Sequence, residues 1–222
     1  MRVKDWIPIY REIAKDLNLR TYDDFIASTI LQRYASGNIN LNLNKKTAYV
    51  IGNSPDMEIY LSSISSGVKI VADSAISRYL KIMGYPDIIV SDLDGDINDL
   101  INANKNGVIT FIHAHGDNID KINKYIKSFN NFIGTTQHIP LKNIYNFGGF
   151  TDGDRSAYLA DHLKFEEIVL IGFDFKRPYL KDYYSKDDII KKKKKLQWAL
   201  ILIKMLAESR GKKLNEAGII EI

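Results

Sequence analysis

The chain has 222 residues, of which 45% are hydrophobic and 26% charged, enough for one large domain or one domain with a small appendage. It contains no cysteine, which excludes disulfides and thiolate metal sites and leaves oxygen-based metal chemistry as the default. The net charge of +4 depends on the lysine run 191–195, so the chain is not basic as a whole.

The first part of the chain is predicted to be helical. Apolar residues recur at helical spacing over residues 6–17. Thr21 followed by Asp24 has the spacing of a capping box at the start of a second helix. We therefore expect residues 1–44 to form a small N-terminal helical appendage to an α/β catalytic domain of residues 45–222.

Nothing in the sequence indicates a membrane protein. Met1 begins a charged stretch that lacks the apolar core of a signal peptide. No apolar run approaches the roughly 18 residues that a membrane span needs. We therefore expect a cytoplasmic protein without a membrane partner.

From residue 45 onward, short apolar runs alternate with helical stretches. Apolar strands separated by helices are typical of a mostly parallel sheet with helices on both faces, so we predict a three-layer, Rossmann-like α/β fold. A long amphipathic helix is expected at about residues 187–209. The predicted strands are residues 47–51, 68–72, 87–90, 108–112, 132–136, 144–147 and 168–172, with a short edge strand at 218–222.

Most of these strands end at a polar cluster, and the clearest cluster follows the strand 87–90. Asp92 and Asp94 lie two residues apart, so at a strand end both carboxylates would share one face. The carboxyl ends of parallel strands line the ligand crevice of an open sheet, and Mg²⁺ accepts protein carboxylates together with phosphate oxygens. The sequence therefore predicts a Mg²⁺ site for a polyphosphate, although a solvated turn is the simpler alternative.

Three other strand ends are candidates for the nucleotide pocket. Asp73, followed by Ser74, would either cap the next helix or border the ligand. Gly52 and Asn53 follow the first strand, where the Gly-Lys-Ser/Thr of a P-loop is missing but the backbone could still line a pocket. Asp174 has the equivalent position after the strand 168–172.

A cluster rich in histidine follows the strand 108–112. It contains His113, His115, Asp117 and Asn118. Two histidines and an aspartate could hold Zn²⁺. Alternatively, the histidines orient the ligand while Asp117 completes the Mg²⁺ site.

A glycine-rich segment precedes the helix expected to begin near Asp154. Adjacent glycines, Gly149 among them, allow backbone N–H groups to approach a ligand closely. Thr151 and Asp152 would lie at the helix N-terminus that faces the crevice, and Arg155 could clamp a phosphate. The alternative is a flexible turn between strand and helix.

The lysine run 191–195 is expected to be mainly a solvated helix face, with one or two side chains in the crevice. It is the only basis for a non-enzymatic nucleic-acid binder. That interpretation leaves the acidic clusters unexplained, because grouped carboxylates repel phosphates unless a metal lies between them. We therefore expect no nucleic-acid partner.

Four ordered motifs together resemble one family, the archaeal 6-hydroxymethyl-7,8-dihydropterin diphosphokinases, which are related to thiamine pyrophosphokinase. The resemblance covers roughly residues 45–210, and Ser74 departs from it by replacing the glycine common after the first aspartate. The motifs are ADSA at 72–75, PDIIVSDLDG at 86–95, HAHGDN at 113–118 and GFTDGDR at 149–155.

The resemblance implies Mg²⁺-dependent transfer of diphosphate from ATP to the hydroxymethyl oxygen of a pterin, with release of AMP, in the synthesis of a folate-type cofactor. Carried onto this sequence, it places Asp92, Asp94 and Asp117 at the metal and Asp73 nearby. ATP and a pterin are therefore the expected partners, and homo-oligomer formation is left open.

The expected mechanism is an in-line displacement in which the protein positions groups and neutralises charge. Arg155 and the glycine-rich segment would hold the terminal phosphates, and His115 is the expected proton acceptor. Phe150 and Phe173 are the expected walls of the pterin slot. The alternative function is a metal-dependent glycosyltransferase using a nucleotide sugar, because such enzymes also hold a metal with a strand-end D-x-D.

Overall fold

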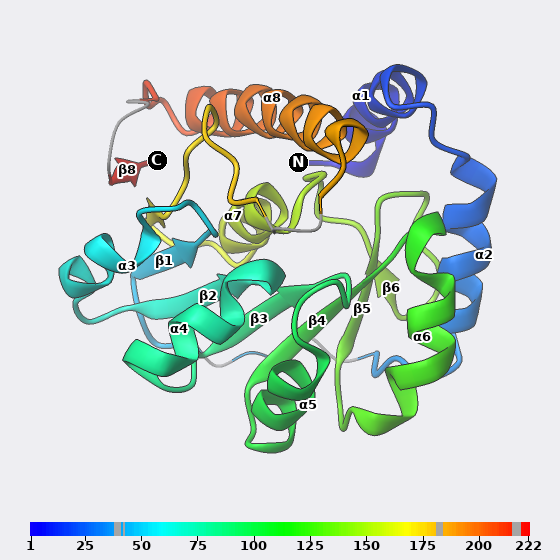
Figure 1. Ribbon diagram of the computed structural model, residues 1–222, viewed down its shortest axis with the longest axis horizontal. Coiled ribbons are helices and arrows are strands. Elements are labelled where there is room, and N and C mark those ends of the chain that lie inside the picture. The colour runs from blue at the N-terminus through cyan, green and yellow to red at the C-terminus, as the bar shows by residue number, and fades with distance from the viewer. Residues whose placement is uncertain (38–40, 42, 181–183, 215–218) are drawn as a thin grey trace.

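The computed structural model describes residues 1–222 except 38–40, 42, 181–183 and 215–218. The described residues form an eight-stranded sheet in the order β6-β5-β4-β3-β2-β1-β7-β8 (Figure 1). Neighbouring strands are parallel except β7 and β8, which confirms the predicted mostly parallel sheet. The strands are β1 (Thr47–Ile51), β2 (Val68–Ala72), β3 (Ile88–Ser91), β4 (Ile109–Ala114), β5 (Ile133–Thr136), β6 (Ile144–Tyr145), β7 (Glu167–Ile171) and β8 (Ile220–Glu221).

Helices cover both faces of the sheet (Figure 1), as expected for a three-layer α/β fold. One face carries α1 (Val3–Asp16), α7 (Asp152–His162) and α8 (Lys186–Ser209). The other face carries α2 (Thr21–Gln32), α3 (Met57–Tyr60), α4 (Ile76–Met83), α5 (Ile97–Lys105) and α6 (Ile119–Tyr125). In the described part of the chain, none of these helices has the length and apolar character needed to cross a membrane.

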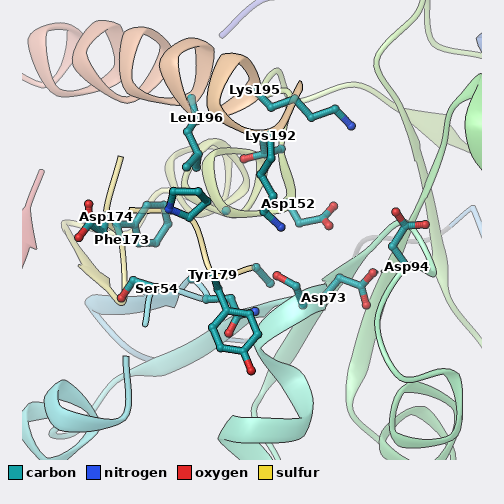
Figure 2. Close-up of a pocket in the computed structure, with 18 of the residues that line it drawn as sticks. Ser54, Asp73, Asp94, Asp152, Phe173, Asp174, Tyr179, Lys192, Lys195 and Leu196 are labelled. Carbon is teal, nitrogen blue, oxygen red and sulfur yellow. Dashed lines mark hydrogen bonds between the residues drawn. The ribbon is translucent and has the colours of Figure 1, made fainter. Parts of the chain in front are cut away.

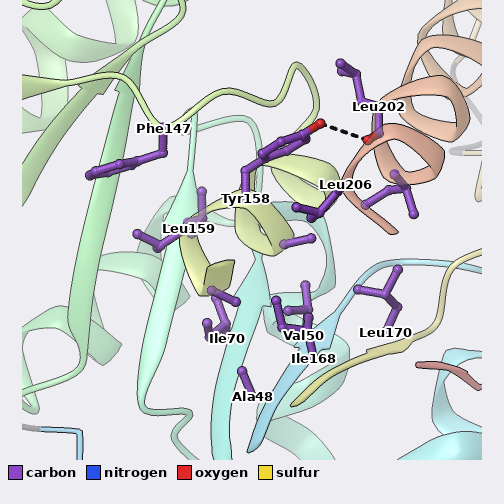
Figure 3. Close-up of a cluster of buried hydrophobic side chains, with 14 of the residues drawn as sticks. Ala48, Val50, Ile70, Phe147, Tyr158, Leu159, Ile168, Leu170, Leu202 and Leu206 are labelled. Carbon is purple, nitrogen blue, oxygen red and sulfur yellow. Dashed lines mark hydrogen bonds between the residues drawn. The ribbon is translucent and has the colours of Figure 1, made fainter. Parts of the chain in front are cut away.

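The two halves of the core follow from the alternation of side chains along each strand. In β1, Ala48 and Val50 belong to the cluster under α7 and α8, whereas Tyr49 belongs to the cluster on the opposite face. The hydroxyl of the buried Tyr158 in α7 donates a hydrogen bond to the carbonyl oxygen of Leu202 at 2.9 Å, which joins α7 to α8 (Figure 3). This contact joins two helices that pack on the same face of the sheet.

The N-terminal helices pack on opposite faces of the sheet. Trp6 of α1 lies in the cluster with α7 and α8, and Leu31 of α2 lies in the other cluster. The predicted capping box does not form, because Arg20 is the N-cap of α2, Thr21 is already helical and Asp24 is turned into the interior. The division of the chain at residue 44 stays a prediction.

Several of the expected strand boundaries differ from the structure by one or two residues. The strand β4 extends two residues beyond its predicted end because His113 pairs in register with Thr135 of β5. His113 is therefore inside the sheet rather than at its open end. The C-terminal strand is present as β8, whereas Gly218, its predicted first residue, lies outside the described residues.

The sheet reverses its strand order at β1, which pairs with β2 on one side and β7 on the other. The chain continues from β1 to a helix on one face and from β7 to a helix on the other, so a crevice opens between them. The backbones after β1 and β7 approach so closely that a Cβ on Gly52 would lie 2.8 Å from the carbonyl oxygen of Gly172. Glycine at position 52 therefore lets the two backbone segments approach each other closely beside the crevice.

Candidate active site

The crevice contains a cavity of about 540 Å³, which we call the large cavity, between the strand ends and α8 (Figure 2). This volume lies in the range of about 300 to 1,000 Å³ that small-molecule and cofactor pockets occupy. The predicted walls Phe150 and Phe173 both line it. The other predicted site residues that line it are Gly52, Asn53, Asp73, Ser74, Asp92, Asp94, Thr151, Asp152 and Asp174.

Three carboxylates from different elements converge on the floor of this cavity. Asp73 follows β2, Asp92 follows β3 and Asp152 begins α7, and each contributes an oxygen within 4.8 Å of the others. Backbone N–H groups of Asp94 and Gly95 donate to Asp73 Oδ2 at 2.8 and 2.9 Å. The buried Asp73 Oδ1 has no hydrogen-bond partner among the described residues, so the cluster offers an unused ligand atom.

The electrostatics of this acidic cluster are those of a site that favours a cation. Burial, followed by the charges of Asp92 and Asp152, raises the pKa of Asp73 well above its usual value. Burial and the charge of Asp92 raise the pKa of Asp152 in the same way. Burial also acts to raise the pKa of Asp92, but the hydrogen bond and charge of His115 hold it below its usual value. A divalent ion would relieve the repulsion, so the residues fit a metal.

The predicted pair Asp92 and Asp94 is divided by the backbone. Leu93 has a left-handed φ of 67°, so the chain has left the strand and side chains two residues apart no longer share a face. Asp94 turns outward, with 62% of its side chain exposed, and pairs with Lys121 at 2.6 Å. The Asp94–Gly95 backbone instead holds Asp73, and a Cβ on Gly95 would lie 2.9 Å from the Asp73 carbonyl oxygen.

The glycine-rich segment has a fixed shape that delivers the start of α7 to the cavity. Gly149 has a φ of 84°, and a Cβ there would lie 2.5 Å from the Cα of Arg155. The buried carboxylate of Asp154 accepts hydrogen bonds from the N–H groups of Phe150 and Thr151, both at 2.7 Å. Asp154 therefore shapes the loop from behind the cavity instead of contacting it.

Arg155 holds the acidic cluster in place. Its side chain is 5% exposed, and its Nη1 donates to Asp152 Oδ1 at 2.8 Å. Its Nη2 donates to the carbonyl oxygen of Phe150 at 2.7 Å, whereas its buried Nε has no partner among the described residues. The two terminal nitrogens of the guanidinium, which the sequence predicted would clamp a phosphate, thus donate hydrogen bonds to protein groups.

Two of the predicted pocket residues shape loops at the rim. Asn53 accepts a hydrogen bond from Arg78 at 2.8 Å. The carboxylate of Asp174 accepts from the backbone N–H of Arg177 at 2.9 Å and from its side chain at 2.6 Å. Both side chains line the large cavity, and both form hydrogen bonds with neighbouring protein groups that hold its rim.

A second cavity of about 170 Å³, which we call the recess, adjoins the first. The two cavities share Asp92, Phe150 and Lys195 as lining residues. The recess is walled by the α1–α2 turn, the turn after β4, Gln137 and the start of α7. The predicted site residues His115, Asp117 and Arg155 line it, so Asp117 belongs to the recess and not to the acidic cluster.

His115 connects the recess to the acidic cluster. Its Nε2 lies 3.4 Å from Asp92 Oδ2, and its Nδ1 accepts the backbone N–H of Asp117 at 3.3 Å. Both ring nitrogens thus face protein partners. The expected role of His115 as proton acceptor stays a prediction, and it requires the weak contact to the Asp117 amide to open.

His113 and Asn118 lie behind this wall and are fully buried. Asn118 donates to the carbonyl oxygens of Asp92 and His113 at 2.8 and 2.7 Å, which ties the ends of β3 and β4 together. Burial, with a smaller contribution from Arg155, lowers the pKa of His113 well below its usual value. His113 is therefore a neutral, interior side chain that contacts Thr135 at 3.0 Å.

Sequence reasoning underestimated the lysine run. Lys191, Lys192 and Lys195 line the large cavity, because Lys195 is four residues after Lys191 and three after Lys192, the spacings that make side chains neighbours on a helix. Figure 2 shows Lys192 and Lys195 extending from α8 on the side of the cavity opposite the strand ends. Lys194 faces away and pairs with Asp16 of α1 at 3.0 Å. The sequence signal that could have identified the cavity-facing lysines is helical spacing, because Lys195 lies four residues before the buried Ala199.

The chain is similar to known proteins over most of its length. A family model described as "6-hydroxymethylpterin diphosphokinase MptE-like" matches residues 26–179. A protein of Pyrococcus furiosus named 6-hydroxymethyl-7,8-dihydropterin pyrophosphokinase is 37% identical, covering 99% of this chain and 100% of the relative. A protein of Methanocaldococcus jannaschii with the same name is 34% identical, with coverage of 94% and 97%. A third, from Methanothermobacter thermautotrophicus, is 36% identical over 79% of each chain.

Proposed function

The chain belongs to the 6-hydroxymethylpterin diphosphokinase MptE-like family, and on that premise we propose that it transfers diphosphate from ATP to 6-hydroxymethyl-7,8-dihydropterin and releases AMP. The observation that carries the proposal is the cluster of Asp73, Asp92 and Asp152 at the floor of a cavity of about 540 Å³. Such a cluster suits the binding of a metal-bound polyphosphate.

We place Mg²⁺ on Asp73, Asp92 and Asp152, because their carboxylates converge and Asp73 Oδ1 is left without a partner among the described residues. When bound, the ion would neutralise phosphate charge and polarise the reacting phosphoryl group. Asp94, the second aspartate of the D-x-D pair, would act at the rim through its contact with Lys121.

The polyphosphate would lie between the acidic floor and the lysines of α8. Lys191, Lys192 and Lys195 line the opposite wall and would supply positive charge to the phosphate oxygens. Charges on both sides of a bound triphosphate would hold it in one orientation, which is the main contribution that a protein makes to phosphoryl transfer.

The reaction forms a bond between the hydroxymethyl oxygen and the β-phosphorus and breaks the bond from that phosphorus to the oxygen shared with the α-phosphate. AMP carries away the electron pair, and the hydroxyl proton passes to a base or to water. Among the chain's own groups, His115 is the candidate that lies beside Asp92 on the recess side. Arg155 would keep Asp152 oriented throughout.

The test is the analysis of products from purified protein mixed with ATP, Mg²⁺ and the hydroxymethyl dihydropterin. We expect equal amounts of AMP and pterin diphosphate, and no turnover once the metal is chelated. Release of ADP without AMP would contradict diphosphoryl transfer. Turnover of a nucleotide sugar by a protein inert toward ATP would support the glycosyltransferase alternative instead.

A further inference from the structure

We propose that the recess is the acceptor site, in which the pterin ring binds while the nucleotide occupies the large cavity. This inference rests on the proposed function and assigns its two substrates to two cavities. It also gives the N-terminal helices a role in the site, because Asn18, Arg20 and Asp23 line the recess.

The first support is the position of the recess relative to the acidic cluster. The large cavity contains all three cluster carboxylates, whereas the recess contacts the cluster through Asp92 alone, with Phe150 and Lys195 also shared. In-line displacement needs the attacking oxygen and the leaving group on opposite sides of the phosphorus. Two cavities that meet at Asp92 allow the acceptor and AMP to lie on different sides.

The second support is that the wall of the recess is built in advance. The buried carboxylate of Asp24 accepts the backbone N–H of Gly116 at 2.8 Å and the side-chain amide of Gln137 at 3.2 Å. It also accepts the hydroxyl of Tyr10, whose pKa is raised mainly by burial. These contacts join α1, α2 and the ends of β4 and β5, so the recess does not depend on one mobile loop.

The third support is a set of polar groups that the fold leaves available. Arg155 lines the recess, and its Nε, which is buried, has no hydrogen-bond partner among the described residues. The exposed Asp117 also lines the recess, and its carboxylate has no hydrogen-bond or ion-pair partner among the described residues. A pterin carries an amino group and ring N–H groups that suit a carboxylate, and a carbonyl oxygen that suits a guanidinium.

Charge and size argue against a second nucleotide in the recess. Its lining holds the carboxylates of Asp23, Asp24, Asp92 and Asp117 against fewer cations, so a polyphosphate would be repelled. A recess of about 170 Å³ is only slightly larger than cavities of about 150 Å³ that hold one benzene ring, so it is too small for a nucleotide. A flat, neutral heterocycle beside Phe150, with its hydroxymethyl group toward Asp92, fits these limits.

The first test separates an acceptor role of Asp117 from a metal-binding role. Asp117→Ala should raise the KM for the pterin about tenfold, the loss expected for one hydrogen bond to a charged group. The KM for ATP and the Mg²⁺ concentration for half-maximal rate should not change. Asp120→Ala is the matched control, because Asp120 is also exposed but lines neither cavity. A changed Mg²⁺ requirement or an unchanged KM for the pterin would overturn the assignment.

The second test measures binding without turnover. Leu19→Trp places a bulky indole ring in the recess. We expect this variant to lose binding of 6-hydroxymethylpterin, measured by pterin fluorescence, and to keep binding of an ATP analogue. Retained ATP-analogue binding also shows that the variant has folded. If the variant binds the pterin as tightly as the wild type does, the acceptor site is refuted. The proposed function would still be supported by release of AMP from the wild-type protein. A wild type that releases no AMP would refute the function itself.

Discussion

The large cavity and the recess share Asp92 as a lining residue and are built in different ways. The large cavity is walled by loops that directly follow β1, β2, β3 and β7, together with one face of α8. The recess is held by a buried hydrogen-bond network that starts from the N-terminal helices. The difference shows that adjoining cavities can be built in one case from contiguous sequence motifs and in the other from isolated residues brought together only by packing.

The largest expected effect tests which acids belong to the centre of the site. Asp92→Asn should lower kcat by about 10² to 10³-fold, as for the loss of one preorganised charge-stabilising group. Asp94→Asn is its matched control and should lower kcat by less than about tenfold, because Asp94 turns outward to Lys121. Thermal unfolding of both variants would verify folding, and similar losses of kcat would restore the D-x-D pair as the metal site.

The next effect tests the wall of the recess. Asp24→Ala leaves the N–H of Gly116, the amide of Gln137 and the hydroxyl of Tyr10 without their acceptor. We expect the free energy of unfolding to fall by about 2 to 4 kcal/mol, measured by urea denaturation.

The control for this wall variant is its neighbour. Asp23→Ala removes a carboxylate whose ion-pair partner Arg20 is 80% exposed, so stability should change by less than about 1 kcal/mol. Equal stability of the Asp24→Ala and wild-type proteins would show that the network does not hold the recess.

The smallest effect tests the lysines above the large cavity. Lys192→Ala and Lys195→Ala should each raise the KM for ATP by about three- to tenfold, since a partly exposed charge contributes about 1 kcal/mol. Added salt should reduce the difference from the wild type. Lys193→Ala is the matched control from the same run, because Lys193 is exposed and lies outside both cavity linings. An equal effect of all three substitutions would indicate general attraction by the lysine run.

Comparison of the expected and observed sites shows which inferences depend on local sequence. The strand ends after β1, β2, β3 and β7 were predictable, because a buried β-branched run followed by a polar turn is a local pattern. The grouping of Asp152 with Asp73 and Asp92 was not predictable, since it depends on how α7 meets the sheet. Asp94 was grouped with Asp92 by its spacing, and the left-handed backbone at Leu93 separates their side chains. Asp117 was placed at the metal by the family resemblance, whereas the structure places it in the lining of the recess.

The sequence by itself determined the parallel α/β architecture, the polar strand ends and the family, because periodicity and ordered motifs are properties of neighbouring residues. Tertiary structure alone decided which carboxylates converge, which lysines of α8 face the cavity and how the N-terminal helices wall the recess. The physical reason is that the contact between Asp24 and Gly116 spans 92 residues. Only the packing of α1 and α2 against the sheet brings such residues together.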